Sequence, residues 1–189
     1  MEDSQRVLAR LFRVYADGIT DVSWVAETLA QEYGIPFQVP RIVKDREEVI
    51  AAIQQANLLD LSREPLQEYL IDLLERKYAV LLQADTVFAF GDLTEDCKML
   101  RGATGWCVQI AADMGKTVYV YDIESRMWFH FKNNQFCLKQ EAPTLALKSV
   151  ILGSKYVGAS TNNAIQTLFH RTFSTHVQDL SRRLEEFNL

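Results

Sequence analysis

The sequence predicts an α/β fold, in which a mostly parallel β-sheet lies between two layers of helices and carries an added β-hairpin. Two observations predict it. Short apolar runs alternate with amphipathic helical patterns over most of the chain, and such alternation is typical of strand–helix–strand units with parallel strands. One run, TVFAFG at 86–91, is apolar almost throughout, as expected of a strand that is covered on both faces.

The N-terminal part of the chain predicts one strand–helix–strand unit. Residues 7–15 are rich in β-branched and aromatic side chains and predict the first strand. From Val22 to Tyr33 the apolar residues recur with helical spacing, and Gly34 follows where a helix commonly ends. Residues 35–39 predict the second strand.

The middle of the chain continues the alternation of helices and strands. Helical patterns cover 44–61 and 62–84, ahead of the strand at 86–91. A further helix is expected from about 105 to 114, and a strand follows it over 117–122. The order of these segments favours parallel pairing, because each strand is reached through a helix.

The C-terminal part predicts a hairpin, a last strand and a closing helix. Residues 126–140 alternate as a β-hairpin does, with Asn133-Asn134 at the turn. A strand is expected over 149–154 and a long helix over 161–189. Because no linker or internal repeat divides the sequence, residues 1–189 are expected to form one Rossmann-like domain with three α/β/α layers.

Composition and net charge disfavour several classes of protein. The net charge of −5 and the absence of a basic run disfavour binding to duplex nucleic acid. No apolar run is long enough to span a membrane, and the N-terminus lacks a signal-peptide pattern, so we expect a soluble, cytoplasmic protein. The three cysteines and three histidines show no metal-ligand spacing, so we expect neither a disulfide framework nor a metal site.

Three turns at predicted strand ends contain glycine: ADGITD, RGATGW and GSKYVGAST. In parallel sheets, ligands bind beyond the carboxyl ends of the strands, where helix N-termini offer free N–H groups. We expect the second turn to cradle a phosphate group through the backbone amides of four residues: Gly102, Ala103, Thr104 and Gly105. Four residues of the other two turns are expected to assist: Gly18, Gly153, Ser154 and Lys155.

The span FAFGDL…LRGATGWCVQIAADMGKTVYVYD resembles the SLOG superfamily, and YADGITDVSWVAETLAQEYGIPF and VILGSKYVGASTNNAIQTLF extend the resemblance. The superfamily includes LOG-type phosphoribohydrolases and DprA-type proteins. The resemblance implies a nucleotide or nucleotide-derived ligand and a homo-oligomer. LOG enzymes carry PGGxGTxxE, whereas Gln109 stands here in the place of the glutamate. An amide can hydrogen-bond a ribose hydroxyl but cannot act as a carboxylate base, so we expect binding or sensing without LOG-type hydrolysis.

Two alternatives remain open at this point. Three carboxylates at predicted strand ends, Asp17, Asp92 and Asp122, are candidate catalytic groups of an N-glycosidase or a deoxyribosyltransferase-like enzyme. The other interpretation is that Asp17 and Asp92 form turns and that Asp21 caps a helix. A second alternative to ligand binding is a protein-interaction domain whose pocket has decayed.

More than one interpretation also stands for several apolar positions. Cys107 is either packed in the core or an activated nucleophile near a helix N-terminus. Trp106 either stacks on a base or packs against the sheet. The hairpin aromatics, Trp128, Phe129 and Phe131, belong to the core, to a dimer surface or to a lid.

Overall fold

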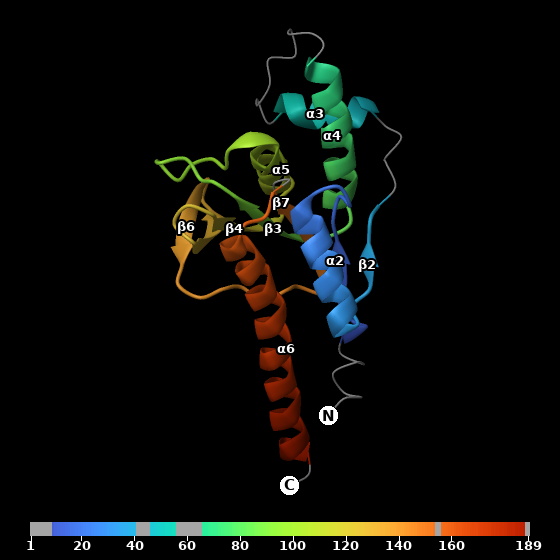
Figure 1. The fold of residues 1–189 in the computed structure, drawn as a ribbon, viewed down its shortest axis with the longest axis vertical. Helices are drawn as coiled ribbons and strands as arrows, with labels where there is room; N and C mark the ends of the chain where they lie inside the picture. The colour runs from blue at the N-terminus through green and yellow to red at the C-terminus, as the bar shows by residue number, and fades with distance from the viewer. Residues whose placement is uncertain (1–8, 41–45, 56–65, 154–155, 188–189) are drawn as a thin grey trace.

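A computed structural model of the chain describes residues 9–40, 46–55, 66–153 and 156–187. It shows an α/β fold with a seven-stranded sheet of order β2-β1-β7-β3-β4-β5-β6 (Figure 1). The five strands from β2 to β4 in this order are parallel, and the last two form an antiparallel hairpin. The predicted fold class is therefore confirmed.

The strands are short and regular. They are β1 (Arg13–Tyr15), β2 (Phe37–Gln38), β3 (Thr86–Gly91), β4 (Thr117–Asp122), β5 (Met127–Lys132), β6 (Gln135–Lys139) and β7 (Lys148–Gly153). The described helices are α2 (Asp21–Tyr33), α3 (Arg46–Gln55), α4 (Leu66–Leu81), α5 (Gly102–Asp113) and α6 (Ala159–Phe187).

The helical connections between parallel strands run in opposite directions from the middle of the sheet. β1 continues through α2 to β2 at one edge, whereas β3 continues through α5 to β4 on the other side. Right-handed crossovers in opposite directions place their helices on opposite faces. β7 lies between β1 and β3, so the strand order reverses around it. Ligands of open α/β sheets bind at such a switch point.

Two apolar layers hold the helices to the sheet. On β3, Phe88 and Phe90 pack with residues of α2 and α6, whereas Val87 and Ala89 pack with residues of α4 and α5. This alternation follows from the period of two along a strand. The sheet is therefore buried between two helical layers (Figure 1).

The β5–β6 hairpin matches the prediction, including its turn. Asn133 and Asn134 both have positive φ, at 51° and 59°, as a two-residue hairpin turn requires. Trp128 is buried against Phe88, Phe90 and Tyr121. The core interpretation of this aromatic residue is thus confirmed.

The first strand is shorter than predicted. It begins at Arg13 rather than at residue 7, and residues 7 and 8 lie outside the described residues. Ala9 has a helical conformation, and the Phe12 amide donates to its carbonyl oxygen at 3.1 Å. Ala9 and Phe12 are buried, and Phe12 meets Phe173 of α6 edge to face. Tertiary packing of these side chains outweighs the strand preference of the segment.

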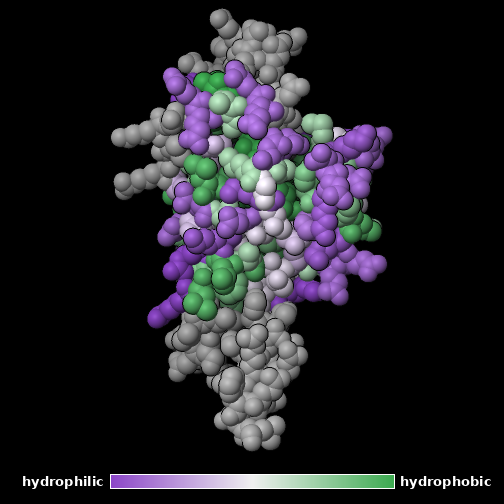
Figure 2. Space-filling view, turned by 180° about the vertical axis from the view of Figure 1, so that it is seen from behind, coloured by the Kyte–Doolittle hydropathy of each residue, from purple (hydrophilic) through white to green (hydrophobic). Residues whose placement is uncertain are grey.

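The surface is mixed in character. The face seen in Figure 2 carries hydrophilic side chains interspersed with small hydrophobic patches. Among the described residues, no helix is long and apolar enough to cross a membrane.

Candidate functional site

The carboxyl ends of β1, β7 and β3 lie side by side in the centre of the sheet. β1 leads into α2, β7 into α6 and β3, through a short excursion, into α5. The three predicted glycine turns therefore meet at one edge, at the switch point. The structure brings Gly18, Gly153 and Gly102 to this edge.

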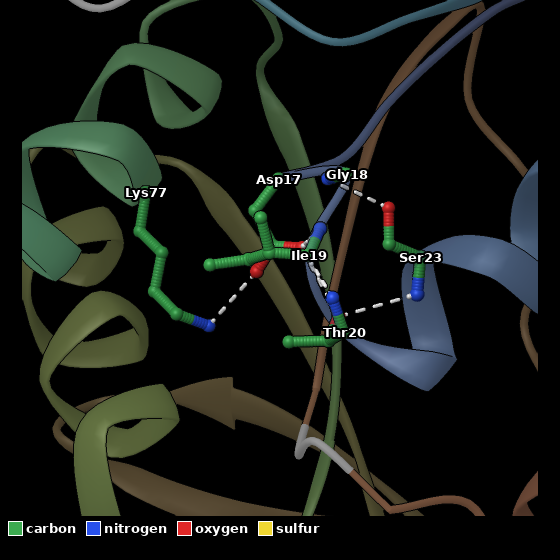
Figure 3. Close-up of polar contacts among 6 residues, drawn as sticks. All are labelled: Asp17, Gly18, Ile19, Thr20, Ser23 and Lys77. Carbon is green, nitrogen blue, oxygen red and sulfur yellow. Dashed lines mark hydrogen bonds and ion pairs between the residues drawn. The ribbon is translucent and has the colours of Figure 1, made fainter.

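The first turn, residues 16–20, is closed by its own side chains (Figure 3). The Asp17 carboxylate oxygen Oδ1 accepts hydrogen bonds from the amides of Ile19 and Thr20, at 3.1 and 3.3 Å, and from the Thr20 hydroxyl at 3.1 Å. The Gly18 amide donates to the Ser23 hydroxyl at 2.8 Å. The Ser23 amide in turn donates to Thr20 Oγ1 at 3.3 Å. Each of these amides already has an acceptor.

A buried ion pair neutralises this turn. Lys77 Nζ of α4 lies 3.2 Å from Asp17 Oδ2, and the two side chains are only 3% and 1% exposed (Figure 3). The contact is ionic rather than an aligned hydrogen bond, because Oδ2 has no hydrogen-bond partner among the described residues. Buried charges are costly unless they are paired. Pairing with Lys77 therefore offsets the cost of burying the Asp17 carboxylate in the first turn.

The amides of Gly18, Ile19 and Thr20 in the first turn are therefore not free to bind an outside anion. The Asp17 carboxylate, from within the chain, accepts hydrogen bonds from amides of the glycine turn. The structure agrees with the turn-forming interpretation of Asp17. The prediction that Asp21 caps the helix is wrong: Thr20 is the N-cap, with an extended backbone and an accepting side chain, and Asp21 is the first helical residue.

The second turn differs. α5 begins at Gly102, and Arg101 at its N-cap makes no side-chain capping bond. The first turn of α5 contains no acidic residue. Arg101 and Gly102 are exposed, and Ala103 is half-buried. A helix N-terminus in this condition has unsatisfied N–H groups and a partial positive charge.

Gly105 has a packing role, as the geometry around it shows. A Cβ atom at this position would lie 1.7 Å from the carbonyl oxygen of Leu100. Thr104 and Gly105 are both buried. Of the four residues predicted to donate amides, Gly102 is exposed and Ala103 is half-buried. Gly153 is also a packing glycine, because a Cβ atom there would lie 2.3 Å from the Val22 side chain.

The remaining predicted ligand residues lie apart from the turn or outside the described residues. Gln109 donates from Nε2 to Asp113 Oδ1 at 2.9 Å, along the surface of α5 and two turns from its start. Ser154 and Lys155 lie outside the described residues. Asp92 is exposed, and its carbonyl oxygen accepts a hydrogen bond from the Arg101 amide.

The carboxylate of Asp122 accepts hydrogen bonds from the loops that follow β3 and β4. Its Oδ1 accepts from the Leu93 amide and its Oδ2 from the Ser125 amide, both at 2.9 Å. Burial raises the pKa of this carboxyl, but the hydrogen bonds from Ser125 and from backbone amides, including that of Leu93, outweigh burial, and the net pKa is lowered. Asp122 thus ties the end of β4 to the segment after β3.

Cys107 has the properties of a packed thiol. It is buried in α5, and burial raises its pKa to about 11, although the nearby Lys77 ammonium acts in the opposite direction. Reactive thiolates have lowered pKa values, so this thiol is not activated. Trp106 is half-buried and packs against the core. Among the described residues, no group of three or more His, Cys, Asp or Glu side chains is placed to hold a metal ion.

Comparisons of the chain with protein-family models, with curated proteins and with solved structures found no match.

Two residues of this edge were not predicted. Lys77 lies three residues after Leu74, on the apolar stripe of α4; a charge within an apolar stripe was the signal for a buried partner. Trp24 is 56% exposed on α2. It falls outside the buried positions of that helix, such as Val22 and Ala26, and an exposed tryptophan is a signal for binding.

Proposed function

We propose that this protein binds a nucleotide or a nucleotide-derived small molecule at the carboxyl edge of its sheet, with the phosphate at the N-terminal turn of α5. The observation that supports the proposal most is that this turn is uncapped, exposed and free of acidic residues. Arg101 provides no cap, the first turn has no acid, and Arg101 and Gly102 are exposed. Uncapped helix N-termini are well suited to phosphate groups.

The position of the turn supports the same ligand class. α5 begins beside the switch point at β7, which is the usual ligand position in open α/β sheets. The Arg101 guanidinium adds a positive charge at this place. The resemblance of the GATGW segment to SLOG proteins is a further argument, because that resemblance implies a nucleotide ligand.

Binding without hydrolysis is favoured over the N-glycosidase alternative. Two of the three candidate carboxylates, Asp17 and Asp122, are buried and hold structural hydrogen bonds. Asp92 is exposed but stands without a second free carboxylate among the three. Glycoside hydrolysis commonly needs a pair of carboxyl groups that flank the bond.

The test is a thermal-shift titration with inorganic pyrophosphate, AMP, ADP, ATP, cyclic nucleotides and ADP-ribose. We expect phosphate-bearing ligands to raise the melting temperature of the wild-type protein. Ala103→Glu places a negative charge in the first turn of α5 and should abolish the shift, whereas Ala103→Gln, its neutral isostere, should keep it. Gly105 is unsuitable for this test because any side chain there meets the Leu100 carbonyl.

No shift with any phosphate-bearing ligand, or a shift that Ala103→Glu leaves intact, would contradict the proposal. In the first case the protein-interaction alternative becomes the better explanation. In the second case the phosphate binds elsewhere.

A further inference from the structure

A shallow cavity of about 440 Å³, largely open to solvent, lies between the first turn of α2 and the first turn of α6. Its wall includes Asp21, Trp24 and Val25 from α2, and Val157, Gly158 and Asn162 around the start of α6. β1 and β7 are neighbours in the sheet, so both helices begin at the carboxyl edge. The volume is within the range of small-molecule sites.

Trp24 gives this cavity a fixed aromatic wall. The side chain is 56% exposed, yet its indole Nε1 donates to the Gly18 carbonyl oxygen at 3.4 Å. That bond restrains the ring while leaving more than half of the residue uncovered. A restrained, exposed aromatic ring is a platform on which a planar ligand ring can stack.

The polar groups of the wall define which ring fits. The Asp21 carboxylate is an acceptor only, and the Asn162 amide both donates and accepts. Among the described residues that line the cavity, Asp21 is the one charged group and it is anionic, so this part of the wall disfavours a phosphate group. A carboxylate here favours an uncharged ring that presents N–H donors.

The first turn of α6 also contains a buried hydroxyl without a hydrogen-bond partner among the described residues. This hydroxyl belongs to Thr161, which is 1% exposed. Buried hydroxyls are usually hydrogen-bonded. Thr161 directly precedes Asn162 of the cavity wall but does not itself line the cavity, so the assignment of a ligand depends on Trp24, Asp21 and Asn162.

We infer that this cavity holds the base of the ligand, as an amino-bearing nucleobase stacked on Trp24 with its N–H groups directed to the Asp21 carboxylate. The inference rests on the proposed function, and it assigns the base and the phosphate to different helices: the base to α2 and α6, the phosphate to α5. Adenine, guanine and cytosine carry an exocyclic amino group, whereas the free N–H of the uracil ring lies between two carbonyl oxygens that a carboxylate repels.

The test separates the base from the phosphate. Adenosine, guanosine, cytidine and uridine, which carry no phosphate, are titrated while tryptophan fluorescence is followed with excitation at the red edge of its absorption. We expect an amino-bearing nucleoside to quench the fluorescence, and uridine to bind more weakly. Trp24→Leu should weaken nucleoside binding by roughly 10- to 100-fold, the range expected for loss of one base-stacking contact.

Two variants check the chemistry and the fold. Asp21→Asn should reduce the preference for the amino-bearing nucleoside over uridine, and the melting temperature of Trp24→Leu should remain close to that of the wild type because Trp24 is exposed. Trp106→Phe serves as the matched control and should leave nucleoside affinity unchanged. A short single-stranded oligonucleotide of the same base is titrated in parallel, because nucleic acid presents the same ring.

The outcomes are distinct. If pyrophosphate raises the melting temperature but no nucleoside binds, or Trp24→Leu binds nucleosides as the wild type does, the base cavity is wrong and the proposed phosphate site stands. If a nucleoside binds at Trp24 but pyrophosphate causes no shift, the proposed phosphate site is wrong and the base cavity stands. Binding of the oligonucleotide alone would overturn the assignment to a free nucleotide.

Discussion

The turns before α2 and α5 occupy comparable places at the same sheet edge but leave their helix N-termini in opposite states. Before α2, the amides of Gly18, Ile19 and Thr20 all donate to side chains of the same turn or helix. Before α5, Arg101 provides no cap. The comparison teaches that a glycine turn after a parallel strand is a phosphate site only if its own side chains do not fill it.

The two turns also differ in how their charge is balanced. The first contains a carboxylate, Asp17, together with an internal counter-ion, Lys77. The second has no acid in its first turn and an exposed arginine before it. An internal anion thus occupies the turn before α2, whereas the uncapped start of α5 is open to an external one. Four predictions test these two turns and the neighbouring contacts of Asp122, beginning with the largest effect.

Lys77→Met should destabilise the protein by about 3–5 kcal/mol, because it leaves the Asp17 carboxylate buried without its counter-ion. Urea unfolding at neutral pH measures the effect. The double variant Asp17→Asn/Lys77→Met removes both charges but keeps an oxygen for the turn amides, and it should be more stable than Lys77→Met alone. A loss below about 1 kcal/mol in the single variant would mean that the carboxylate does not depend on the ion pair.

Gly105→Ala should cost about 3 kcal/mol, because its Cβ atom would overlap the Leu100 carbonyl and the backbone must shift. Gly102→Ala should cost only about 1 kcal/mol: its φ is +73°, which strains an L-residue, but a Cβ atom there has open space. Thermal unfolding of both variants gives the comparison. Equal losses would contradict the assignment of Gly105 to packing and of Gly102 to the open part of the turn.

Asp122→Asn should cost about 2 kcal/mol at neutral pH, since the carboxylate receives two charge-assisted hydrogen bonds. The pKa of this carboxyl is lowered in the folded protein. Its stabilising contribution is therefore fully present above the unfolded pKa of about 3.9 and is lost as the pH falls through the folded pKa.

Urea unfolding of wild type and variant across the acid range tests this dependence. The difference in the free energy of unfolding should shrink as the pH is lowered from neutral. A difference that stays constant down to the acid limit would show that charge plays no part in the contribution of Asp122.

How far the sequence predicts the fold depends on whether a feature is local. The strands at 86–91 and 117–122 and the helix end at Gly34 agree with the structure, because apolar runs and a positive φ are properties of neighbouring residues. The start of β1 does not agree, because Phe12 packs on distant Phe173. The central position of β7 likewise depends on pairing between strands far apart in sequence.

In the candidate site, too, local features could be predicted and features that depend on distant contacts could not. The glycine turns could be located from the sequence, but not whether each was open, because that depends on contacts across the fold. Lys77 reaches the Asp17 turn from α4, and the Leu100 carbonyl explains why residue 105 is glycine. The cavity beside Trp24 arises only because β1 and β7 are neighbours.

The smallest predicted effect tests the comparison most directly, because it makes each turn resemble the other. Asp21→Asn removes the first-turn acid of α2 and should lower stability by about 0.3–1 kcal/mol, and Ala103→Glu adds one to α5 and should raise it by a similar amount. Urea unfolding at low ionic strength measures both, with Ala103→Gln as the neutral control, and added salt should shrink both differences. If Ala103→Glu gains no stability over Ala103→Gln, then the N-terminus of α5 is not electropositive and holds no advantage for an anion. If Ala103→Glu gains stability and also loses the pyrophosphate shift, then a negative charge stabilises the N-terminal turn of α5. In the wild-type protein, which has no acidic residue in that turn, a bound anion would provide this charge.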